Sequence, residues 1–144
     1  MATDEPIQLV LPKSSKGETP EDNQVVALAE EYLETIPNIG TEGVFNLTYT
    51  GYALDTKPYQ ALFMATNRTG ETIEDFSFVL DLQIGDQTIW QKTLFRITKE
   101  AFGEIPAHSS MPILISVPEG KETDLLKATH DNIQISLSRL QKLT

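Results

Sequence analysis

The stretch FSFVLDLQI, residues 76–84, decides the fold of this chain. Its large apolar side chains occupy every second position: Phe76, Phe78, Leu80, Leu82 and Ile84. Side chains of a β-strand alternate between two faces, so this period predicts a strand with one buried face. Gly85 and Asp86 follow, and residues 89–97 form another apolar stretch, which predicts a tight turn and a return strand.

The same alternation extends in both directions from this hairpin. It recurs at residues 45–53, 59–65, 113–117 and 133–137, with Gly51 as an expected bulge in the first of these. Pro112 and Pro118 flank the stretch at residues 113–117 and predict a place at a sheet margin. Six short strands without long helices between them predict a mainly β protein, an immunoglobulin-like antiparallel β-sandwich.

An amphipathic helix is expected before the sandwich, over residues 19–37. Thr19 is a hydroxyl N-cap, Pro20 suits the first helical position, and Glu21 and Asp22 face the positive helix end. Apolar residues then recur at spacings of three and four up to Ile36. The pattern favours a helix that covers one open end of its own sandwich. The alternative is a detachable acidic helix that engages a partner.

Residues 1–18 are expected to form a flexible arm, because they contain Pro6, Pro12 and the segment KSSKG. Their deletion is accordingly expected to leave the melting temperature nearly unchanged. The alternative is that the apolar patch at Ile7, Leu9, Val10 and Leu11 adds an edge strand or docks on another surface. Residues 19–144 are expected to form a single domain, with the helix at 19–37 and the sandwich at 44–144.

The charge of the chain argues against several kinds of partner. The formal net charge is −10 and the pI is about 4.5. Nucleic acid and anionic bilayers would be repelled, and no apolar run approaches the roughly 18 residues of a membrane span. The N-terminus is acidic where a secretory signal would be basic. We therefore expect a soluble, cytoplasmic protein, or an extracellular or cell-envelope one if a signal peptide has been removed.

The residue types that carry chemistry are sparse. The chain has no cysteine and two histidines, His108 and His130, neither with a second ligand at metal-binding spacing. No serine lies in a nucleophile elbow and no glycine-rich loop could cradle a phosphate. The sequence predicts a protein that is not an enzyme, with no cofactor and no metal.

Aromatic side chains are the better candidates for recognition. Trp90 is expected in the core, whereas Tyr52 falls on the polar side of its strand and could contact a partner. The loop from Ile105 to Met111 is the second candidate surface and the acidic helix is the third. The candidate contact residues are Tyr52, Ile105, His108, Met111 and Tyr32.

Residues 44–118 resemble the SLAP domain of Gram-positive bacteria, which occurs in S-layer assembly proteins of the accessory Sec export system. The likeness lies in FMATN at residues 63–67, the hairpin from Val79 to Phe95, and the segment GEIPAHSSMP at residues 103–112. The chain has one such copy where the family often has two, and Met111 where a basic residue is common. The resemblance implies a non-enzymatic role in the export or assembly of surface proteins.

Two functions follow from these observations. The first is a protein-binding module that recognises a secreted client or an export component through a sheet edge or a loop face. The alternative is a structural ectodomain of a cell-envelope surface protein or lipoprotein. The sequence leaves the oligomeric state open.

Overall fold

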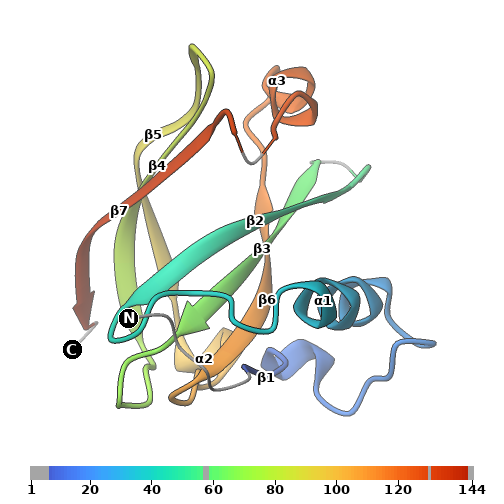
Figure 1. Ribbon diagram of the computed structural model, residues 1–144, viewed down its shortest axis with the longest axis vertical. Helices are drawn as coiled ribbons and strands as arrows, with labels where there is room; N and C mark the ends of the chain where they lie inside the picture. Colours follow the sequence, from blue (N-terminus) through green and yellow to red (C-terminus); the bar gives the residue numbers. More distant parts are fainter. Residues whose placement is uncertain (1–6, 57–58, 130, 143–144) are drawn as a thin grey trace.

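Two packed β-sheets form the body of the protein, as the computed structural model shows for residues 7–56, 59–129 and 131–142 (Figure 1). The first sheet has the order β1 (Gln8–Leu9), β6 (Ser109–Ser116), β3 (Gln60–Asn67) and β2 (Phe45–Leu54). The second has the order β5 (Gln87–Ile97), β4 (Phe76–Ile84) and β7 (Ile133–Lys142). The predicted mainly β architecture with two stacked sheets is confirmed.

The main core lies between the two sheets. The five alternating apolar residues of β4 are all buried, and Leu80 and Phe78 have no exposed surface. Trp90 of β5 is 4% exposed, and its ring lies 5.8 Å from that of Phe63 in the opposite sheet. The prediction that Trp90 belongs to the core is therefore confirmed.

The helix α1 spans Gln24–Thr35 and begins later than predicted. Asn23 is its N-cap, and its side-chain Oδ1 accepts a hydrogen bond from the backbone N–H of Val25 at 2.8 Å. The Thr19 carbonyl instead accepts from the N–H groups of Asp22 and Asn23, both at 3.0 Å, and closes a separate turn. The expectation that Thr19 caps the helix was wrong because Asn23 satisfies the free N–H group of the first turn.

This helix covers the outer face of the first sheet and not an open end of the sandwich (Figure 1). Ala29 and Leu33 of α1 pack with Ile39 and with Met64 of β3 in a second, smaller core. Because α1 covers one face and the second sheet covers the other, β3 is buried from Ala61 to Asn67. The helix packs on its own domain.

The expected flexible arm, residues 1–18, is docked on the domain from residue 7 onward. The N–H groups of Gln8 and Val10 donate to the carbonyl oxygens of His108 and Ser110 at 3.1 and 3.0 Å, so β1 adds to β6 in parallel. Leu9 packs against the small core, and Val10 packs against the main core. The short 3₁₀ helix η1 (Lys13–Ser15) follows. From residue 7 onward the segment adopts the alternative, an added edge strand, because its apolar residues have an uncovered strand to pair with.

Strand β6 is longer than predicted and carries Pro112 within it. The carbonyl groups of His108 and Ser110 face β1, so by alternation the nitrogen of Pro112 faces the same side. Strand β1 pairs only with Ser109 and Ser110, so the N–H group that proline lacks would have had no strand partner. Strand β6 therefore lies at the margin of its sheet, as expected, except at Ser109 and Ser110, where β1 pairs with it.

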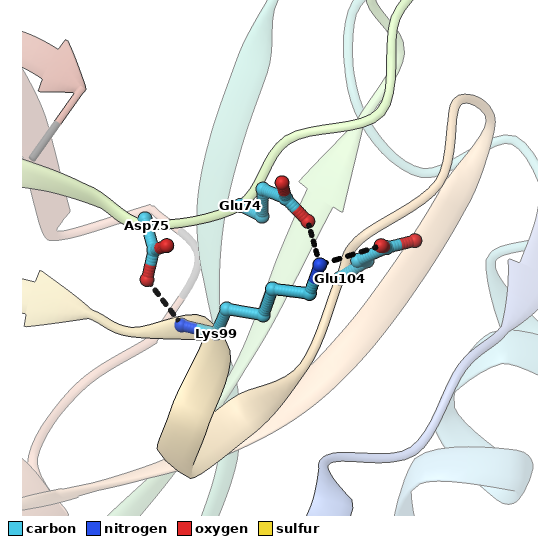
Figure 2. A network of polar contacts seen from close by, with 4 residues as sticks. All are labelled: Glu74, Asp75, Lys99 and Glu104. Atoms are coloured by element: carbon cyan, nitrogen blue, oxygen red, sulfur yellow. Dashed lines mark hydrogen bonds and ion pairs between the residues drawn. The ribbon is translucent and has the colours of Figure 1, made fainter. Parts of the chain in front are cut away.

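Two short helices close the ends of the sandwich, α2 (Lys99–Phe102) and α3 (Glu122–Leu126). Lys99 links α2 to the segment before β4, as Figure 2 shows. Its backbone N–H donates to Asp75 at 2.6 Å, and its ammonium group lies 3.3 Å from Glu74 and 3.5 Å from Glu104. The hydrogen bond to Glu74 is the main reason that the pKa of Lys99 is raised. The carboxylates of Glu74 and Glu104 are therefore already paired with the Lys99 ammonium group.

Candidate functional site

A groove runs between the free edges of β2 and β7, and we call it the β2–β7 groove. The two strands belong to different sheets and contact one another along one side of the sandwich. The groove contains a first hollow of about 630 Å³ and a second of about 290 Å³. Ile133 and Ile135 of β7 line the first hollow, and Leu137 and Leu140 line the second.

Among the residues that the structure describes, no charged side chain lines either hollow of this groove. The walls of the first hollow consist of Tyr32, Ile36, Leu47, Thr48, Tyr49, Thr50, Gly51, Ala128, Thr129, Ile133 and Ile135. Those of the second consist of Gly43, Val44, Phe45, Thr69, Leu137 and Leu140. Three other surface hollows each include at least one carboxylate. An uncharged groove in a chain of net charge −10 is suited to an apolar or neutral ligand.

Several large apolar side chains of the groove are open to solvent. Leu140 is 49% exposed, Val44 is 43% exposed and Ile36 is 36% exposed. They account for three of the five large apolar residues with high exposure in the described part of the chain, the others being Leu94 and Leu126. Exposed apolar side chains around a groove are typical of binding surfaces.

One backbone edge of the groove is available for pairing. Within the described residues, β7 pairs with β4 on one side and with no strand on the other. The N–H group of Gly85 donates to the carbonyl oxygen of Asn132 at 2.9 Å, and the register continues without a shift to Ser138. By antiparallel alternation, the N–H and C=O groups of Ile133, Ile135 and Leu137 therefore point away from β4.

Two tyrosines in the wall of the first hollow have raised pKa values. Burial, and then the proximity of Tyr59, raises the pKa of Tyr49 to about 12. Burial, and then the proximity of Tyr52, raises the pKa of Tyr32. Both rings thus present apolar surface and an uncharged hydroxyl to the groove.

The five candidate contact residues do not form one site. Tyr32 lies in the wall of the groove, and Tyr52 follows Gly51 and lies close to Tyr32. Ile105 and Met111 have no exposed surface, so the expectation that they contact a partner was wrong. Their side chains belong to the main core because Ile105 bridges to Ile73 and Met111 lies inside β6.

The candidate contact residue His108 does not line the groove. His108 precedes β6, two strands away from β2, and its carbonyl group pairs with β1. His130 lies outside the described residues. Among the described residues, no cluster of three or more histidine and carboxylate side chains could hold a metal ion.

The residues of β7 were missed as site residues because alternation alone marked them as core. Ile133, Ile135 and Leu137 do pack on the main core, but each is only partly buried. One signal in the sequence points to them, since residues 133–142 carry no acidic side chain in a strongly acidic chain. Recognising the groove requires knowing that β7 is an edge strand beside β2.

Comparisons of the chain with protein-family models, with curated proteins and with solved structures found no match. No helix in the part of the chain that the structure describes has the length and apolar character of a membrane span. The geometry of the groove therefore provides the main evidence for function.

Proposed function

We propose that this chain is a non-enzymatic protein-binding module that receives a protein partner in the β2–β7 groove. The single observation that supports this proposal is the uncharged, solvent-open apolar groove on a chain of net charge −10. The described walls of the groove offer apolar area and the hydroxyl groups of threonine and tyrosine, with no carboxylate, imidazole or amine. Recognition is the function that such a surface can perform.

The proposal includes an immunoglobulin-like strand arrangement. Strands β2, β3 and β6 follow the A, B and E order of that fold, and β5, β4 and β7 follow the C′, C and F order. The G strand of an immunoglobulin domain would lie beyond β7, where the described residues place no strand. The groove would then occupy the position of a missing sheet strand.

The resemblance of residues 44–118 to the SLAP domain suggests the identity of the partner. It supports a role in the export or assembly of bacterial surface proteins, carried out from the cytoplasm. The partner would then be a secreted client or a component of the export machinery. The cluster of exposed apolar side chains in the groove is consistent with capture of a client before it has folded.

Photo-crosslinking in the source organism tests this proposal. A photoreactive benzoylphenylalanine replaces Leu140 in the groove, and the matched control places it at Leu94 of β5, which has similar exposure at 54%. We expect adducts with an unprocessed surface protein or an export component from position 140 and not from position 94. Equal adducts from both positions, or none from position 140, would contradict the proposal.

A further inference from the structure

We infer that the element bound in the groove is a single extended segment of the partner, which adds to the free edge of β7 as a further strand. This inference rests on the proposed protein-binding function and specifies how the partner is recognised. The partner chemistry is an uncharged peptide with large apolar side chains at alternate positions. Backbone pairing, apolar hollows and charge each support it.

The backbone of β7 supplies the pairing groups. Ile133, Ile135 and Leu137 direct their N–H and C=O groups away from β4, as the register shows. Ile135 and Leu137 can each exchange two hydrogen bonds with an added antiparallel strand. The N–H of Ile133 already donates to the carbonyl oxygen of Thr129 at 3.2 Å, so Ile133 offers its carbonyl group alone. The segment 133–138 contains no proline, glycine or charged residue that would block such pairing.

The free edge of β5 differs from that of β7. Strand β5 carries Lys92 and Arg96, and Lys92 has a φ of 45° at a break in the register with β4. Charges and irregularities of this kind protect edge strands from pairing with other chains. Strand β7 has comparable features only at its end, where Arg139 has a φ of 51° and Lys142 is the last residue. Residues 133–138 of β7 carry none of these protective features.

The hollows define the side chains that the added strand should carry. The first hollow lies beside Ile133 and Ile135 and the second beside Leu137 and Leu140, about four residues further along. Side chains of a strand face one side at every second residue, so a bound strand can fill both hollows from positions i and i+4. The larger hollow favours an aromatic or large aliphatic side chain, and the smaller one an aliphatic side chain.

The charges favour a foreign peptide over a second copy of this chain. Two copies would bring two net charges of −10 together, and β7 and β2 contain no group that offsets them beyond Arg139 and Lys142. The inward side chains of β7 in a second copy already pack on their own core. They cannot also fill the hollows of a partner, whereas a segment that is not yet folded can.

Peptide selection tests the inference directly. A display library of random 12-residue peptides is selected on the full chain, and the enriched peptides are synthesised with a fluorescent label. We expect them to share large apolar residues at i, i+2 and i+4. Affinities are measured by fluorescence anisotropy for the unchanged chain and for variants whose fold is verified by thermal melting.

Two groove variants have matched controls outside the groove. Leu140→Lys introduces a charge into the second hollow, and Leu94→Lys introduces the same charge at similar exposure on β5. Ala128→Trp fills the first hollow, and Leu126→Trp adds the same ring in a different hollow. We expect each groove variant to weaken binding at least tenfold and each control to change it less than twofold.

A scan of backbone N-methylation along the bound peptide distinguishes a strand from other conformations. Methyl groups at alternate positions should weaken binding, since only every second N–H of an added strand pairs with β7. A scan without this period of two would overturn the inference. So would a dimer in light scattering that Ala128→Trp abolishes, because the occupant would then be a second copy.

The two proposals can fail separately. Crosslinks from position 140 together with peptides that lack the alternating pattern would preserve the protein-binding function and refute the added strand. Alternating peptides that bind in the groove without any cellular crosslink would support the added strand and refute the proposed role in export.

Discussion

Arg68 shows how a single buried residue organises the connection between α1 and β2. Its side chain is 1% exposed, and its Nε donates to the carbonyl oxygen of Ile39 at 3.0 Å. Gly40 follows Ile39, and a Cβ there would meet Thr66 Cγ2 at 2.7 Å and Arg68 Cγ at 3.2 Å. The loop can reach Arg68 because position 40 has no side chain.

Replacement of this glycine should therefore be costly. Gly40 and Gly43 have similar positive φ values of 92° and 85°, but nothing lies within 4 Å of a Cβ at position 43. We expect Gly43→Ala to cost about 1 kcal/mol from backbone strain, and Gly40→Ala to cost about 1–3 kcal/mol more from the added clash. Urea unfolding of both variants measures the difference. Equal losses would show that Thr66 and Arg68 move aside freely.

The raised pKa of Tyr49 makes the stability of the folded protein depend on pH in the alkaline range. Burial raises its pKa from 10.0 to about 12 in the folded state, so above pH 10 the unfolded chain loses its phenolic proton first. The stabilisation is complete below pH 10 and is lost as the pH rises to 12. We expect the free energy of unfolding to fall over this window and to fall less in Tyr49→Phe. Identical pH profiles of the two proteins would refute the assignment.

At the scale of the element, β1 and α1 depend on each other. Strand β1 lies at the edge of the first sheet and α1 covers the outer face of that sheet, where Leu9 packs against the small core that includes Ala29, Leu33 and Met64. The two residues of β1 make few backbone hydrogen bonds of their own. Side-chain burial is therefore the main attachment of the N-terminal segment.

A pair of adjacent substitutions tests this attachment. Leu9→Ser removes the packed side chain and should cost about 1–2 kcal/mol, whereas Gln8→Ser alters an exposed neighbour and should cost less than about 0.5 kcal/mol. Thermal and denaturant unfolding provide the comparison. A loss below about 0.5 kcal/mol for both variants would restore the earlier expectation of a loosely attached arm.

At the scale of the whole molecule, one core joins the two sheets. Trp90, the single tryptophan, lies 5.8 Å from Phe63 in the opposite sheet and 6.4 Å from Phe95 in its own strand. Its fluorescence therefore reports on packing between the sheets. The small core under α1 shares β3 with the main core, since Met64 faces one and Phe63 faces the other.

Because β3 belongs to both cores, we expect the two sheets and α1 to unfold cooperatively. We expect the denaturant transitions followed by Trp90 fluorescence and by far-ultraviolet circular dichroism to coincide, because β3 cannot lose one core without exposing the other. The same experiment on Leu9→Ser controls for loosening of α1. Loss of helical signal at a lower denaturant concentration than the fluorescence change would show that α1 melts independently.

The sequence by itself determined the elements whose environment is local. Alternation from Phe76 to Ile84 identified a strand with one buried face, since a period of two needs no knowledge of the partner strand. Trp90 was placed in the core because a tryptophan on a sandwich strand usually fills the core, as in immunoglobulin domains. The helix was expected in the correct region, but its start was misplaced because Thr19 and Asn23 are both suitable caps.

Only the tertiary structure decided which strands lie at the edges and therefore where a partner could bind. The positions of β2 and β7 side by side depend on pairings between residues far apart in the chain, which no local period encodes. Ile105 and Met111 were expected at the surface because a loop sequence does not reveal which side chains turn inward. Side-chain period is a property of one strand, whereas an open edge is a property of the whole sheet.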